Sequence, residues 1–220
     1  MPAAPLSPTP RSTVRRLGER ARTDRAELYA VLDEALICHL GVVVDGGPRV
    51  LPTGYGRIDD TLYLHGSTGA SSLRAAESTP VCVTVTLLDG IVYARSVFHH
   101  SMNYRSAVVH GRPRVVADAG ERVRALEAIV EHLAPGSWAH ARRPTRKELA
   151  ATTVLALDLA EASVKVRTGP PKDDEDDVVQ GGRWAGVLPV RSEFGAPEPC
   201  ELLDSADVPA PGHVAGRRTS

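Results

Sequence analysis

The chain has 220 residues, 42% of them hydrophobic, which suits one soluble domain with tails. Its 26 Lys and Arg residues nearly balance 27 Asp and Glu residues, so the net charge gives no reason to expect a nucleic acid or an anionic membrane as the main partner. Three widely separated cysteines, no apolar run near the roughly 18 residues that span a bilayer, and a start without a secretory apolar centre predict a cytoplasmic protein.

Residues 1–22 are expected to form a disordered Pro- and Arg-rich arm. The stretch MPAAPLSPTPRS is rich in Pro and Ser, and several arginines follow it. Such a composition buries too little apolar surface to offset the entropy of ordering. No aromatic residues lie between the arginines, so we expect no specific nucleic-acid binding. On this interpretation the arm is dispensable for folding and ligand binding.

Residues 23–168 are expected to form the folded domain, which begins with an amphipathic helix after Asp24. Six segments of β character follow: ICHLGVVVD, RVLPTGYGRI, TLYLHG, VCVTVTLL, IVYARSVF and SAVVHGRPRVV. Turn-forming residues at 45–48, 59–60 and 89–90 predict tight reversals between antiparallel neighbours. Closely spaced strands of this number favour a barrel or a sandwich.

Helical patterns interrupt and follow these strands. One covers residues 69–78, and a stronger one follows Asp118 and ends before Pro135. Residues 153–167 resemble one long last strand that closes the sheet. Residues 169–191 are predicted to be an acidic linker and a Trp-containing segment that packs on the barrel or on a partner subunit. Residues 192–220 are predicted to be a loose tail.

Two segments combine residues suited to binding. In the first, helix N–H groups, the Ser71 and Ser72 hydroxyls and the Arg74 cation can hold a phosphate. Gly54 and Gly56 in the preceding strand can let a flat ring approach the backbone. A merely capped helix is the open alternative for this segment.

The second segment is ARSVFHHSMNYRSAVVHG, residues 94–111, which gathers donors and cations. Adjacent residues on a strand point to opposite faces, so His99 and His100 are not expected to bind one ion. We therefore predict no metal site there.

The strings RVLPTGYGRIDDTLYLHGSTGASSLRAA and PVCVTVTLLDGIVYARSVFHHSMNYRSAVVHGRPRVV resemble the pyridoxamine 5′-phosphate oxidase-like flavin-nucleotide-binding proteins, in the branch related to nitroimidazole-resistance proteins. The resemblance covers about residues 24–191. It implies a mainly β fold with flanking helices, a six-stranded antiparallel split β-barrel, and a homodimer that binds FMN in clefts at its interface.

The resemblance also implies positions for the cofactor. The expected set is Thr53, Gly54 and Tyr55 along the isoalloxazine ring, His65, Gly66 and Ser67 towards the ribityl chain, and Ser71, Ser72, Arg74, Arg105, Ser106 and Trp184 around the phosphate and the ring. Ser71 and Ser72 stand where relatives place basic residues, which removes a charge-assisted contact worth about 1 kcal/mol or more. A surface ion pair is the alternative for Arg105, and a hydrophobic anchor is the alternative for Trp184.

The function implied is an FMN-dependent oxidoreductase that transfers a hydride at flavin N5 to or from a small flat substrate. Tyr104, His99 and His100 are the candidates for a general acid, and the sequence does not choose among them. Two alternatives stay open. One is a non-catalytic flavin-nucleotide binder or sensor, and the other is a split-barrel dimer that has lost FMN and binds a deazaflavin or haem.

Overall fold

The fold is built on antiparallel strands. The structure, a computed structural model, describes residues 5–6, 9–203 and 208–217. Within that part, ten strands join in the order β1-β9-β6-β5-β2-β3-β4-β8-β7, and β10 pairs with β5. The strands are β1 (Ala21–Arg22), β2 (Ile37–Val44), β3 (Gly47–Ile58), β4 (Thr61–Ser67), β5 (Val81–Tyr93), β6 (Ser101–Gly111), β7 (Arg114–Val115), β8 (Thr152–Asp158), β9 (Ala162–Arg167) and β10 (Gly186–Pro189).

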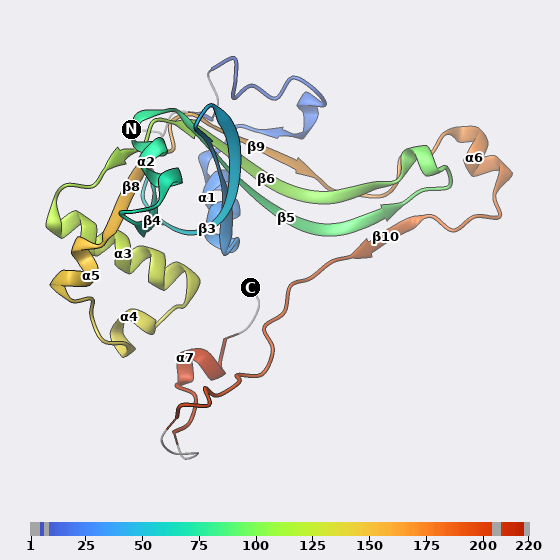
Figure 1. Cartoon of the computed structure of the whole chain (residues 1–220). Helices are drawn as coiled ribbons and strands as arrows, with labels where there is room; N and C mark the ends of the chain where they lie inside the picture. The colour runs from blue at the N-terminus through green and yellow to red at the C-terminus, as the bar shows by residue number, and fades with distance from the viewer. Residues whose placement is uncertain (1–4, 7–8, 204–207, 218–220) are drawn as a thin grey trace.

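Helices flank this sheet. They are α1 (Arg25–Glu34), α2 (Ser71–Ser78), α3 (Ala119–Leu133), α4 (Ser137–His140), α5 (Arg146–Ala150), α6 (Glu175–Gln180) and α7 (Gly212–Ala215), with 3-10 turns at Gly18–Arg20 and Val97–His99. Figure 1 shows α3, α4 and α5 on one side of the barrel, while β5, β6 and β10 extend away from it as a long ribbon that carries α6 near its tip. We call residues 88–104 and 173–189 the β-ribbon. Among the described residues, no helix is long and apolar enough to cross a membrane.

The split-barrel prediction of a mainly β fold with flanking helices is confirmed, with more strands than the six expected. The additional strands include the short β1, β7 and β10 at the margins of the sheet. Alternate residues of the strands face the barrel interior. There Tyr55, Leu64 and Val83 pack with Leu28 and Leu32 of α1, all of them essentially inaccessible to solvent.

A second core lies between α3 and the outer side of β4 and β8. It contains Tyr63, Ile129, Val154 and Ala156. The backbone of α3 also comes very close to that of the neighbouring strand β3. A Cβ placed on Gly56 of β3 would lie only 2.6 Å from the carbonyl carbon of Ala128 in α3. A glycine at this point allows α3 to sit directly on the sheet.

The reversal predicted at residues 89–90 is wrong. β5 runs through this point, and its pairing with β6 shifts between Leu88 and Gly90 as in a β-bulge. The chain reverses later, in the 3-10 turn at Val97–His99. The other two reversals are confirmed: Asp45 and Gly46 have φ of 51° and 77°, as a type I′ hairpin requires, and Asp59 has φ of 50°.

The single last strand predicted for residues 153–167 is also wrong. It divides into β8, which pairs with β4, and β9, which pairs with β6. The Asp158 side chain accepts a hydrogen bond from the N–H of Ala160 at 2.6 Å, which is a local turn that competes with extended backbone. The Leu159 N–H donates to the Asp60 carbonyl at 2.9 Å and fixes the corner.

Residues 5–6 and 9–22 of the predicted disordered arm make contacts with the folded domain, whereas residues 1–4 and 7–8 lie outside the described part. Leu6 is only 5% exposed and belongs to the barrel core. Arg11 donates from Nε to Glu161 Oε1 at 2.7 Å, and the Thr9 hydroxyl donates to the same carboxylate. Charge pairing and one buried leucine thus attach a segment whose composition alone favours disorder.

The regions predicted as a linker and a tail also make contacts. Asp173 accepts hydrogen bonds from the backbone N–H and Nη1 of Arg95, both at 2.7 Å, and the acidic run that follows begins α6. Further on, the Arg217 guanidinium lies 4.1 Å above the Phe194 ring. Residues 204–207 and 218–220 of the predicted tail lie outside the described part.

We expect Gly56→Ala to lower the free energy of unfolding by about 2 kcal/mol or more, because its methyl group must push α3 off the sheet. Gly54→Ala in the same strand is the control. A Cβ there meets nothing within 4 Å, so its effect should stay within about 1 kcal/mol. Urea denaturation measures both, and equal effects of the two substitutions would contradict the close approach.

Candidate functional site

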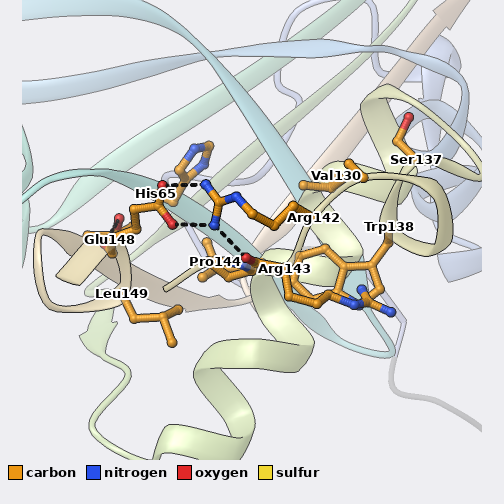
Figure 2. A pocket seen from close by; sticks show the side chains of 12 residues that line it. His65, Val130, Ser137, Trp138, Arg142, Arg143, Pro144, Glu148 and Leu149 are labelled. Atoms are coloured by element: carbon orange, nitrogen blue, oxygen red, sulfur yellow. Dashed lines mark hydrogen bonds and ion pairs between the residues drawn. The ribbon is translucent and has the colours of Figure 1, made fainter. Parts of the chain in front are cut away.

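A pocket of about 300 Å³ opens between β4 and the helices α3, α4 and α5. Figure 2 shows His65 and Trp138 in its lining together with Arg142 and Arg143. Leu126 and Val130 of α3 and Leu149 of α5 supply apolar surface. His65 faces this side because the alternate residues Leu62 and Leu64 of β4 point into the barrel.

Hydrogen bonds among Arg142, Glu148 and Thr145 fix part of the polar lining of the pocket. Arg142 donates from Nη2 to Glu148 Oε1 at 2.8 Å, and this pairing, with the Thr145 N–H, lowers the pKa of Glu148 to about 2. The Arg143 guanidinium lies 4.4 Å over the Trp138 ring and has no carboxylate partner among the described residues. The pocket therefore keeps one cation that forms no close ion pair, although its charge helps the Gly136 and Trp138 N–H groups to lower the pKa of Glu131.

Neighbouring carboxylate contacts fix the helix that bears Trp138. Glu131 accepts hydrogen bonds from the N–H groups of Gly136, at 2.6 Å, and Trp138, at 2.7 Å. Desolvation lowers the pKa of His65 below its usual value of 6.5, although much of the residue remains accessible to solvent. At neutral pH its imidazole is therefore mainly the neutral form that binds metals.

A second polar region lies at the start of α2. Ser71 and Ser72 open the helix, and no side chain caps its first N–H groups. Arg49 of β3 donates from Nη1 to the Ser71 hydroxyl at 3.4 Å, so the structure places a cation beside the predicted phosphate position. The sequence carries no local signal for Arg49, because the approach of the β2–β3 hairpin to α2 is a tertiary contact. Arg74, the predicted replacement, is exposed on the same helix.

Arg105 does not have the free guanidinium that the predicted phosphate contact requires. It donates from Nη2 to Glu34 Oε1 at 2.7 Å and to Asp89 Oδ1 at 2.8 Å, and from Nε to Asp89 Oδ2 at 3.1 Å. These hydrogen bonds raise the pKa of the guanidinium. The geometry supports the alternative, an ion pair, which here joins the end of α1 to β5 and β6.

The remaining predicted residues lie in the β-ribbon, on β3 and β4, and on β6. His99 contacts Asp174 at 3.1 Å through Nε2, and Trp184, 70% exposed, lies 5.9 Å from the Tyr93 ring centroid. These residues and His100 belong to the β-ribbon. The two histidines lie in and directly after its 3-10 turn, not in the strand expected for them. Figure 1 shows that the β-ribbon points away from α3–α5, so one chain does not bring them to the His65 pocket.

The residues of β3 and β4 also separate. The Tyr55 side chain is buried in the barrel, where its hydroxyl lies 2.8 Å from the Ala35 carbonyl oxygen, so only its backbone is left for a ligand. Gly66 packs against Leu73, whereas Ser67 accepts a hydrogen bond from the Gly69 N–H at 3.2 Å. Thr53 and Gly54 of β3 are half-buried and pair with Cys38 and Ile37 at the start of β2. Tyr104 and Ser106 are half-buried on β6 and face outward, opposite to the buried Ala107 and Val109.

The pyridoxamine 5′-phosphate oxidase family model matches residues 24–166. The chain therefore belongs to this family. No curated protein matches the chain.

Two solved structures are similar over most of their length. The flavocytochrome Anf3 from Azotobacter vinelandii shares 39% identity over 98% of this chain and 100% of that chain, with a TM-score of 0.91. The FAD and heme binding protein from Mycobacterium smegmatis shares 41% identity over 90% of this chain and 96% of that chain, with a TM-score of 0.85.

A 5-nitroimidazole antibiotic resistance protein described as putative, from Bacteroides thetaiotaomicron, is 23% identical over 66% of this chain and 86% of that chain. Its TM-score is 0.57, and the likeness concerns the fold.

We expect Arg105→Gln to lower the free energy of unfolding by about 1–2 kcal/mol, because Glu34 and Asp89 would then repel each other without their shared cation. Arg142→Gln is the control, since both partners of its ion pair are largely exposed and its loss should cost less than about 0.5 kcal/mol. Denaturant titration distinguishes the two. Equal stability of Arg105→Gln and wild type would contradict the assignment.

Proposed function

We propose that this protein binds both a flavin and haem, and that it acts as a redox protein in which electrons pass between the two. The observation that carries the proposal is the His65 pocket, which combines a neutral imidazole, apolar walls and arginines. The family and the two close relatives, one a flavocytochrome and the other named for FAD and heme, support the same combination.

The residues of the pocket fit the chemical groups of haem. Neutral histidine is the common proximal ligand of haem iron, and His65 is the histidine in the pocket lining. Leu126, Val130 and Leu149 would lie against the apolar macrocycle. Arg143 would pair with one propionate of the haem. Arg142 would pair with the other after giving up its ion pair with Glu148. This replaces the ribityl contact first expected for His65.

The flavin would bind on a different surface. Its phosphate would lie at the start of α2, where Arg49 supplies the charge that Ser71 and Ser72 lack. Since one relative is named for FAD, we propose FAD as the flavin, with FMN as a weaker ligand of the same site. A bound flavin would supply hydride and single-electron chemistry, while the protein positions it and limits access to water.

A second copy of the chain would complete the flavin cleft. Ile37, Val43 and Val50 of β2 and β3 are 50%, 50% and 68% exposed. All three face outward from the barrel, and the pairing of β2 with β3 places them on one surface. We propose that the homodimer covers this face. The β-ribbon residues Tyr93 and Trp184 would then reach the partner, which accommodates the predicted contribution of Trp184 from the other subunit.

We expect His65→Ala to abolish haem reconstitution, measured as loss of the Soret band after incubation with hemin and desalting. His110→Ala on β6 is the control and should retain the band. Because burial lowers the pKa of His65 from its usual 6.5, haem affinity should be retained at neutral pH and fall as the imidazole is protonated in acid. A Soret band of full intensity in His65→Ala would overturn the assignment.

We expect Arg49→Gln to weaken FMN binding about tenfold and to leave riboflavin binding unchanged, because riboflavin lacks the phosphate. Flavin fluorescence quenching measures both affinities. Arg124→Gln on α3 removes one charge elsewhere and controls for net charge. An equal loss for riboflavin and FMN would show that Arg49 does not contact the phosphate.

A further inference from the structure

The N-terminal segment, residues 9–22, lies across the outer face of β6 and β9. Besides the contacts of Thr9 and Arg11 with Glu161, the Lys165 ammonium donates to the Arg16 carbonyl oxygen at 3.0 Å. The pairing of β1 with β9 then holds the end of the segment, with Ala21 opposite Lys165. The segment is thus attached at both ends and spans the sheet between them.

A cavity of about 260 Å³ lies under this span. The segment contributes Val14, Arg15 and Arg16 to its lining, and the sheet contributes residues of β6 and β9. The sheet residues are Ser106, Val108, Ser163 and Lys165. The register explains their common face, because Ser106 pairs with Lys165 and Val108 pairs with Ser163.

The charges of this cavity are not neutralised. Arg15, Arg16 and Lys165 have no carboxylate partner among the described residues, and the lining includes no Asp or Glu. This distinguishes them from the arginines that do form close ion pairs, which are Arg11, Arg25, Arg57, Arg95, Arg105, Arg114 and Arg142.

The positive field extends along β9. Arg167 follows Lys165 on the same face and is buried with hydrogen bonds to the carbonyl oxygens of Gly169 and Pro170, both at 3.2 Å, rather than to a carboxylate. Burial, followed by the charge of Arg20, lowers the pKa of the Arg167 guanidinium. Tyr104 pairs with Arg167 and borders the same face. The predicted site residues Tyr104 and Ser106 therefore lie beside a cationic groove, not beside the His65 pocket.

We infer that this groove is an anion site for a phosphorylated or diphosphorylated small molecule. Three cations and the Ser163 hydroxyl suit the charge and acceptor oxygens of a phosphate or diphosphate. The Ser106 hydroxyl donates to the Lys165 carbonyl oxygen at 3.4 Å and would have to exchange that partner for the ligand. Val14 and Val108 provide apolar surface for the organic part of such a ligand. The site is separate from the pocket at His65 and from the start of α2.

The test uses full-length protein and inorganic pyrophosphate, titrated by calorimetry at low ionic strength, where charge contacts are least screened. The double variant Arg15→Gln, Arg16→Gln removes two lining charges, and neither side chain has a charged partner to lose. It should weaken pyrophosphate binding roughly tenfold or more. The control Arg124→Gln, Arg191→Gln removes two charges outside the groove and should bind as wild type does.

Two outcomes would overturn the inference: no saturable pyrophosphate binding by the wild type, or an equal loss in both double variants. The Soret and flavin absorption of the variants is measured in parallel, so failure of this site is distinguishable from failure of the proposed function.

The source of the phosphate is decided by a second titration. If the groove holds the adenosine monophosphate unit that FAD has and FMN lacks, Arg15→Gln, Arg16→Gln will weaken FAD binding but spare FMN. If the ligand is a separate molecule, pyrophosphate will still bind protein that is saturated with FAD. Both results support an anion site in the groove.

Discussion

The close approach of α3 to β3 at Gly56 determines where the candidate haem pocket lies. With no side chain between them, the helix backbone rests on the strand, and Ile129 reaches the second core with Tyr63 and Val154. The same helix then presents Leu126 and Val130 towards His65 of β4. The short helices that follow add Trp138 and the two arginines, and the Glu131 carboxylate fixes their start. The absence of a side chain at Gly56 of β3 thus determines the position of α3 and, with it, of the pocket.

Pairing of arginines organises the rest of the molecule. Arg105 joins α1 to β5 and β6 through Glu34 and Asp89, and the Arg95–Asp173 ion pair joins the two parts of the β-ribbon. Against this background, the unpaired cations are informative. Arg143 lies in the His65 pocket, and Arg15 and Arg16 lie in the groove under the N-terminal segment. Removing a charged group from water costs free energy unless a ligand or remaining solvent compensates its charge.

The sequence was sufficient for the fold class and for most elements. Short segments of β character between turn residues predicted β2–β4, and the Asp24 and Asp118 caps predicted α1 and α3, because these signals are local. Asp89-Gly90 has the composition of a turn, yet pairing with β6 keeps the strand continuous as a bulge. Arg105 and Trp184 were placed by resemblance at one cleft, whereas long-range ion pairing and the β-ribbon separate them from His65. Arg49 and Arg143 gave no signal, since their sites exist only through tertiary contacts.

The central claim is that one chain carries a flavin and a haem that exchange electrons. The most direct test is an anaerobic absorption experiment on protein reconstituted with hemin and FAD and then desalted, in which the flavin is reduced by light with a sacrificial donor. The account predicts about one haem and one flavin per chain, and haem reduction that follows flavin reduction and does not occur when FAD is omitted. Protein that retains flavin without haem, or haem that stays oxidised beside reduced flavin, would contradict it.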